Sequence, residues 1–146
     1  KEIRAVYGDP FMDSNPWFID RMVKLELPQL QAKLWDKYLS GKDWIWCHEK
    51  VAFPLHTVFY AIEAANLCST IPEYNGIYNL RTIRGSTRPS FHAYGAAIDL
   101  NASQDPFGDH KIDMDRRVVS IFESIGFTWG GRWLKPDAMH FQWGSY

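Results

Sequence analysis

Two short segments in the second half of the chain alternate between apolar and polar residues, and this pattern constrains the fold most. In residues 96–101 the aliphatic side chains point one way and Asp99 points the other way. In residues 138–143 large apolar side chains alternate in the same manner with His140. A period of two predicts β-strands that bury one face and leave the other open. If the two strands are near neighbours, Asp99 and His140 extend from the same face of one sheet.

Helical spacing dominates the first part of the chain. One helix is predicted to begin at Pro28 and to stop at Gly41, with an apolar stripe of Leu30, Leu34 and Tyr38. The N-terminal third is therefore predicted to be helical.

Two further helices follow. Residues 51–67 place Ala52, Leu55, Phe59 and Ile62 on one stripe, which predicts a second amphipathic helix. A third helix is predicted to be capped by Asp113 or Asp115, to bury Val118, Phe122 and Ile125, and to end at Gly126.

Helices followed by strands with a helix between them predict an α+β fold over a small, mainly antiparallel sheet. Residues 127–129 are expected to add a short strand before the Gly130–Gly131 pair. The 146 residues contain no repeat and no segment typical of a linker. We therefore expect a single domain over residues 1–146, acting as a monomer.

The composition excludes some classes of function. With 16 basic and 17 acidic residues the net charge is −1, which argues against a nucleic-acid-binding protein. There is no run of eighteen apolar residues, so membrane insertion is not expected. Aromatic residues make up 16% of the chain, either to fill the core or to line a groove for sugar or peptide. Cys47 and Cys68 are expected to be buried thiols, although one disulfide is also compatible with the sequence.

A third metal-binding group precedes the first strand, because His92 lies seven residues before Asp99. Two histidines and a carboxylate that leave one position for water are typical of a catalytic zinc site. We interpret the other histidines (His48, His56 and His110) as packing or solvated residues.

Asp137 lies three residues before His140 and directly after Pro136. A carboxylate close to a metal ligand, but not itself a ligand, can act as a general base on water. An aspartate after a proline is also common in turns, and the spacing alone does not separate the two interpretations.

These residues resemble a known family. Residues 90–101, SFHAYGAAIDLN, are similar to the S-x-H-x-x-G-x-A-x-D signature of the zinc D-alanyl-D-alanine carboxypeptidases. That family includes the vancomycin-resistance D,D-peptidases and phage L-alanyl-D-glutamate endopeptidases, and it shares its fold with the Hedgehog signalling domain. Residues 137–141, DAMHF, resemble the second motif, and residues 130–133, GGRW, resemble the endopeptidase branch. Two ordered motifs are far more specific than one short pattern.

The chain departs from the pattern of many members at two positions. Asp137 stands where they have glutamate, and Met139 stands where they have tryptophan. Other endopeptidases of the family resemble this chain here, so the change is interpreted as the mark of a subgroup.

The resemblance implies a mechanism. His92, Asp99 and His140 would bind Zn²⁺, which would lower the pKa of a water molecule, and Asp137 would accept the water proton. Arg81, the best match to the family's arginine among Arg81, Arg84 and Arg88, would stabilise the oxyanion. Ser90, Arg88 and Trp133 are the candidate substrate contacts. Trp129 and Trp133 could each form a wall of the substrate cleft or fill the core.

The expected substrate is a peptidoglycan stem peptide, cleaved at the L-Ala–D-Glu bond by an endolysin or a cell-wall remodelling enzyme. Removal of the terminal D-Ala and a non-catalytic zinc module are the alternatives. The enzyme would act on the cell wall, in the periplasm or outside the cell, after export or after release of a phage lysin at lysis.

Overall fold

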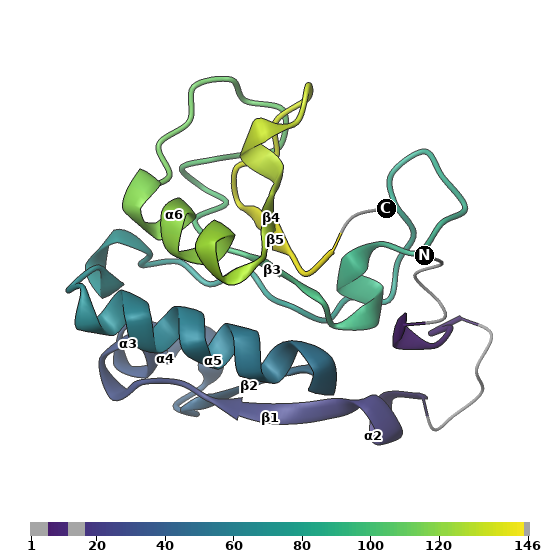
Figure 1. Ribbon diagram of the computed structural model, residues 1–146, viewed down its shortest axis with the longest axis horizontal. Helices are drawn as coiled ribbons and strands as arrows, with labels where there is room; N and C mark the ends of the chain where they lie inside the picture. Colours follow the sequence, from purple (N-terminus) through teal and green to yellow (C-terminus); the bar gives the residue numbers. More distant parts are fainter. Residues whose placement is uncertain (1–5, 12–16, 145–146) are drawn as a thin grey trace.

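Two small antiparallel sheets, with helices packed on them, form the α+β fold of the computed structural model (Figure 1). The structure describes residues 6–11 and 17–144. The elements of the first half are α2 (Trp17–Arg21), β1 (Met22–Glu26), α3 (Gln29–Leu34), α4 (Asp36–Leu39), β2 (Trp44–His48) and α5 (Glu49–Ala64). Those of the second half are η1 (Cys68–Thr70), η2 (Phe91–Tyr94), β3 (Ala97–Asp99), α6 (Arg116–Ile125), β4 (Thr128–Trp129), η3 (Gly130–Arg132) and β5 (His140–Gln142).

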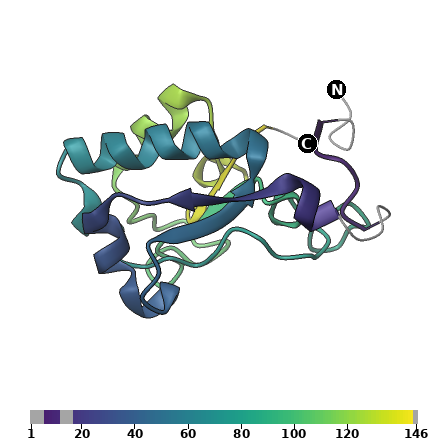
Figure 2. The same cartoon turned by 90° about the horizontal axis from the view of Figure 1, so that it is seen from below.

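Strands β1 and β2 pair antiparallel on one side of α5 and are connected through α3 and α4; this pair is called the hairpin below. Their register runs from the pair Met22–His48 to the pair Glu26–Trp44. Leu25 and Ile45 are buried, and α5 runs along the hairpin in both views (Figures 1 and 2). The second sheet and α6 lie on the opposite side of α5 (Figure 1). The long helix is therefore the centre of the fold.

The hairpin corrects the prediction that the N-terminal third is helical. In β2, Ile45 and Cys47 are buried while Trp44 is half-buried and Trp46 is exposed. The strand thus alternates between two faces, but its outward residues are also large and apolar. Hydropathy alone does not reveal this period of two, because both faces of the strand count as hydrophobic.

The predicted stripe between Pro28 and Gly41 faces solvent. Exposed fractions are 59% for Leu30 and 43% for Leu34, whereas Trp35 is fully buried. Trp35 also interrupts the segment, which forms the two short helices α3 and α4 in place of one. Its indole Nε1 donates a hydrogen bond of 2.8 Å to the carbonyl of Ile71. Burial of this large ring decides which face of the segment turns inward.

The other two helices agree with the sequence patterns. Helix α5 buries Leu55, Phe59 and Ile62, although Ala52 is only half-buried. Helix α6 begins at the predicted cap, where the carboxylate of Asp115 accepts a hydrogen bond of 2.9 Å from the backbone N–H of Arg117. None of the helices in the described part of the chain is long and apolar enough to cross a membrane.

The second sheet has the strand order β3–β5–β4, and all of its neighbours are antiparallel. The two alternating segments are therefore neighbours, as the sequence analysis required. The core below them is aromatic: the rings of Phe122 and Phe141 stack with their centroids 4.0 Å apart. Cys47 and Cys68 are both buried free thiols, which confirms the expectation.

Gly95, between η2 and β3, has a left-handed backbone with φ of +66°. A Cβ atom here would lie 2.5 Å from Sδ of Met22 and 3.1 Å from the backbone nitrogen of His48. Gly85 has a similar φ of +76° but open space around the same position.

We expect Gly85→Ala to lower the free energy of unfolding by about 1 kcal/mol through backbone strain alone. Gly95→Ala adds overpacking against buried neighbours and should cost about 2–4 kcal/mol. Urea unfolding of both variants measures the difference. Equal losses would show that close packing of Gly95 does not constrain the segment that carries His92.

Candidate metal centre

His92, Asp99 and His140 converge at one end of the second sheet. Asp99 and His140 face each other directly in the register of β3 and β5. Asp99 lies between the two rings: its Oδ2 is 3.1 Å from Nε2 of His92, and its Oδ1 is 3.1 Å from Nδ1 of His140. The three candidate ligand atoms lie within 4.8 Å of one another. The structure therefore brings together the three residues that the sequence predicted as ligands.

A short helical turn positions His92. The hydroxyl of Ser90 caps η2 by accepting a hydrogen bond of 3.1 Å from the backbone N–H of His92. Gly95 ends the turn, and its backbone N–H donates to the carbonyl of His92 over 3.0 Å. Both ends of the turn are thus held by hydrogen bonds, which fixes the backbone of His92.

Hydrogen bonds on the outer side of each imidazole determine which nitrogen is free to bind a metal. Nδ1 of His92 lies 2.8 Å from the carbonyl oxygen of Ile77, which can only accept, so Nδ1 carries the proton. Nε2 of His140 lies 2.8 Å from Oε1 of Gln142. The amide nitrogen of Gln142 donates to the carbonyl of Gly144 over 3.0 Å, which fixes the amide with its oxygen toward His140. In the neutral rings, Nε2 of His92 and Nδ1 of His140 therefore present lone pairs to Asp99.

Two lone pairs and a carboxylate pointing at one place require a positive charge there, either a proton or a metal ion. Nε2 of His92 is buried, and it faces Oδ2 of Asp99 at 3.1 Å. Two neutral histidines and one carboxylate form a donor set that suits Zn²⁺. Within the described residues, no further His, Cys, Asp or Glu joins the three. The arrangement fits a metal ion that keeps a position for solvent.

The titration behaviour of the site follows from the same contacts. Burial would raise the pKa of Asp99, but hydrogen bonds from His140 and His92 outweigh burial and hold the pKa below its ordinary range. Burial opposes the charged form of His140, yet its bond to Asp99 leaves the pKa raised. Without a bound metal ion, a proton held between Asp99 and His140 would supply the positive charge.

Asp137 lies beside this centre on the loop before β5. Its Oδ2 is 4.0 Å from Nδ1 of His140, and its buried Oδ1 has no hydrogen-bond partner among the residues that the structure describes. Burial raises the pKa of Asp137, while the charges of nearby His140 and Arg81 oppose the rise. Gly130 allows this position, because a Cβ there would lie 2.5 Å from the carbonyl oxygen of Asp137. Gly130 therefore lets the carboxylate lie close to the centre.

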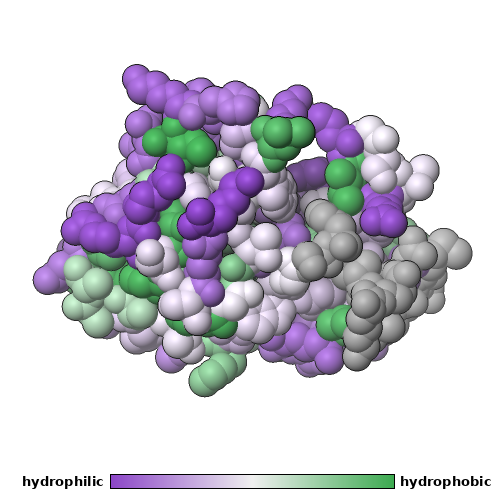
Figure 3. Space-filling model, turned by 45° about the horizontal axis from the view of Figure 1, so that its top comes forward, coloured by the Kyte–Doolittle hydropathy of each residue, from purple (hydrophilic) through white to green (hydrophobic). Residues whose placement is uncertain are grey.

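The centre opens into a cleft of about 330 Å³ on the face turned forward in Figure 3, where the surface is hollowed. Arg81, Ser90 and Trp133 are among its lining residues, together with Asp137. The cleft also contains Arg84, one of the three candidates for the oxyanion arginine, and Phe107, which the sequence analysis did not consider.

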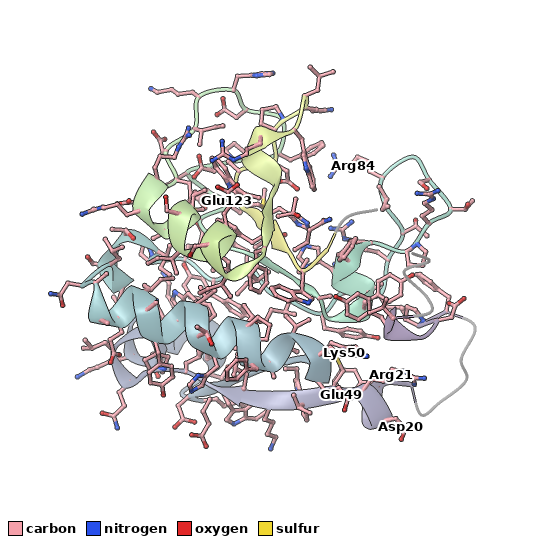
Figure 4. The ribbon with its side chains drawn as sticks, in the orientation of Figure 1. Asp20, Arg21, Glu49, Lys50, Arg84 and Glu123 are labelled. Atoms are coloured by element: carbon pink, nitrogen blue, oxygen red, sulfur yellow. The ribbon has the colours of Figure 1, made fainter. Side chains whose placement is uncertain are left out.

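Cations are concentrated at one side of this cleft. The guanidinium of Arg84 lies 4.9 Å from the ring centroid of Phe107, and the Lys135 ammonium lies 4.8 Å from the same ring. Figure 4 shows Arg84 extending from its loop toward the C-terminal segment. Arg88, a predicted substrate contact, is exposed and is not among the residues that line the cleft.

The two tryptophans that flank Gly130 and Gly131 have different roles in the structure. Trp129 is 2% exposed and donates from Nε1 to the carbonyl of Ala138 over 2.8 Å, so it fills the core. Trp133 is 36% exposed, lines the cleft, and lies with its ring centroid 5.4 Å from that of His140. Trp133 is therefore the one of the two that forms a wall of the cleft.

The remaining histidines lie outside the centre. His48 is buried and caps α5 by accepting from the backbone N–H of Lys50, and burial lowers its pKa to about 4. His56 stacks on Tyr60 with the ring centroids 4.3 Å apart, and His110 is exposed. This agrees with their interpretation as packing or solvated residues.

Residues 84–143 match the family model described as D-alanyl-D-alanine carboxypeptidase. The matched segment is less than half of the chain, but it contains the three candidate ligands and Asp137. It supports a hydrolase of this peptidase family for the part of the chain that carries the site. A search of curated proteins returned no match.

Two positioning groups escaped the sequence analysis. Gln142 follows His140 by two residues in an alternating strand, so its place on the same face was a signal that could have been used. The carbonyl of Ile77 carries no such signal, because a backbone group is independent of residue type. We expect metal binding to depend on the side chain of Gln142 and on the carbonyl of Ile77.

Gln142→Leu removes the acceptor that orients His140, and we expect zinc affinity to fall about 10- to 100-fold. Competition with a chelating dye measures the affinity. Gln104→Leu, on an exposed loop, serves as the control. If the two variants bind zinc equally well, Gln142 does not position the ligand.

The Asp99–His140 pair should give the metal-free protein a stability that depends on pH in two opposite directions. The contribution of Asp99 is present above its unfolded pKa of about 4 and is lost as pH falls through the lower folded pKa. The contribution of His140 is complete below its unfolded pKa of about 6.5 and is lost as pH rises through the higher folded pKa.

Together these contributions are largest between about pH 4 and 6.5. Urea unfolding in the presence of a chelator, repeated across pH, tests this for the wild type and Asp99→Asn. We expect the variant to lose this pH dependence. If the free energy of unfolding changes with pH in the same way in both proteins, the Asp99–His140 pair is not the source of the pH dependence.

Proposed function

We propose that the protein is a zinc-dependent peptidase of bacterial peptidoglycan, acting on the L-Ala–D-Glu bond of the stem peptide. One observation supports the proposal: three donor atoms point at a common position in an open cleft, beside a buried carboxylate with an oxygen that no described residue contacts by a hydrogen bond. The family match supports the peptidase class. The protein would act at the cell wall, in the periplasm or outside the cell.

His92, Asp99 and His140 would hold the ion, and Ile77 and Gln142 would keep both imidazoles in the ligating tautomer. Bound zinc would supply Lewis acidity toward a water molecule and the scissile carbonyl. Asp137 would accept the proton of the attacking water on Oδ1 and deliver it to the leaving amine. Its raised pKa suits a group that must both accept and release a proton.

Arg81 is the proposed partner of the developing oxyanion. It lines the cleft with Asp99 and Asp137, and its charge acts on Asp137. Ser90 lines the same cleft, and while its oxygen accepts from the turn its hydroxyl hydrogen can donate to the substrate backbone. Trp133 would bound the substrate on the side of His140.

Removal of a terminal D-Ala is the second candidate, favoured by the description of the matched family. Digestion of purified peptidoglycan, followed by mass spectrometry of the fragments, separates the two activities. A new free amine on D-Glu supports the endopeptidase. Loss of a single alanine supports the carboxypeptidase, and unchanged peptidoglycan would support a non-catalytic zinc module.

Asp137→Asn should retain one zinc per chain and lose hydrolysis by about 10²- to 10⁴-fold, because the amide cannot accept the proton. Asp109→Asn is the matched control, since Asp109 lies in an exposed loop and only accepts from the backbone N–H of Lys111. Zinc content and the rate of peptide release are measured together. Near wild-type hydrolysis by Asp137→Asn would remove Asp137 from the mechanism.

A further inference from the structure

Four aromatic rings form a continuous row outside the metal centre. Ring centroids are 5.3 Å apart for Trp44 and Trp46, 5.3 Å for Trp46 and Phe18, and 5.1 Å for Phe18 and Tyr78. Each pair meets edge to face, with interplanar angles of 70–82°. Trp46 is 38% exposed, so a large indole remains accessible. The row is more exposed than filling the core would require.

The hairpin explains why the two indoles lie together. Trp44 and Trp46 alternate along β2 with the buried Ile45 and Cys47, so both extend from the outer face of the strand. Lys24 lies opposite Trp46 in β1, and its ammonium is 4.3 Å from the centroid of the Trp44 ring.

The row lines a groove of about 450 Å³. Its other lining residues include Tyr38, Ser40 and Lys42 near the end of α4. The Lys42 ammonium lies 5.3 Å from the centroid of Trp44. The groove thus combines aromatic surfaces with hydroxyl and ammonium groups that can donate hydrogen bonds.

The groove shares lining residues with a hollow at the metal centre. Residues 76–78 line it, and they also line a smaller hollow of about 140 Å³ together with His92 and Asp99. Ile77, in the middle of this stretch, is the residue whose carbonyl orients His92. A ligand in the groove would therefore contact the segment that positions His92.

We propose that this groove binds the glycan strand to which the stem peptide is attached. A pyranose ring has a flat C–H face that suits an aromatic side chain, and hydroxyl and acetamido groups that suit the polar groups of the rim. A purely apolar partner would leave Lys24 and Lys42 without hydrogen-bond acceptors where they cover Trp44. The inference rests on the proposed function, since it assigns a second part of the same substrate.

The length of the stem peptide relates the sugar to the bond that is cleaved. In peptidoglycan the L-Ala residue is joined directly to the lactyl group of the muramic acid. The L-Ala–D-Glu bond therefore lies one residue from that group, whereas the terminal D-Ala lies at least three residues, or roughly 10 Å of extended chain, further away. A sugar groove that shares its lining with the metal centre favours the first bond. The glycan would then lie on the side of the hairpin, and the remaining peptide on the side of Arg84 and Phe107.

Binding to peptide-free glycan strands, prepared by amidase treatment of peptidoglycan, tests the inference without hydrolysis. We expect the zinc-loaded wild type and Asp137→Asn to bind them, and Trp46→Ala to bind at least about tenfold more weakly, about 1.4 kcal/mol. Trp46→Tyr should restore most of the affinity. Phe53→Ala is the control, because Phe53 is 79% exposed on α5 and is not among the groove-lining residues.

A kinetic measurement separates the groove from the chemistry. For Trp46→Ala, the ratio of kcat/KM for a muramyl-linked stem peptide to kcat/KM for the free peptide should fall about tenfold. The inference is overturned if the wild type does not bind glycan strands, or if Trp46→Ala binds them and discriminates the two substrates as the wild type does. If glycan binding depends on Trp46 but no substrate is cleaved, the proposed function fails while the sugar site stands.

Discussion

The antiparallel pairing of β3 with β5 is the constraint on which the rest of the structure depends. It places Asp99 directly opposite His140, at the separation of a cross-strand pair, although the two residues are 41 positions apart in the chain. The turn of η2 then brings His92 to the other carboxylate oxygen of Asp99. A slip of the register by one residue would move His140 to the core side of the sheet and abolish the centre.

Groups outside the three ligands give the centre its chemical character. The carbonyl of Ile77 and the amide of Gln142 hold the imidazoles so that their lone pairs meet at Asp99. Burial of Asp137 next to this cluster provides a carboxylate with a raised pKa, and one of its oxygens has no hydrogen bond within the described part of the chain. The N-terminal hairpin contributes the aromatic row, whose groove shares residues 76–78 with a hollow at the centre. Both halves of the fold therefore contribute to the surroundings of this segment.

Much of this arrangement could be predicted from the sequence, because local patterns specified it. The alternation around Asp99 and His140 indicated the paired strands, and the cap at Asp115 indicated α6. The hairpin could not be predicted from hydropathy, since Trp44 and Trp46 make its outer face as hydrophobic as its inner face. The orientation of the amide of Gln142 depends on a bond to the backbone of Gly144, which no residue pattern encodes.

The central claim is that His92, Asp99 and His140 share one metal ion, and zinc titration of the metal-free protein tests it most directly. Calorimetry should show one tight zinc site per chain in the wild type. Asp99→Asn keeps the shape of the side chain but removes the charge, so it should lose that site. The account would be contradicted by a wild type that binds no zinc, or by an Asp99→Asn variant that binds zinc as tightly as the wild type.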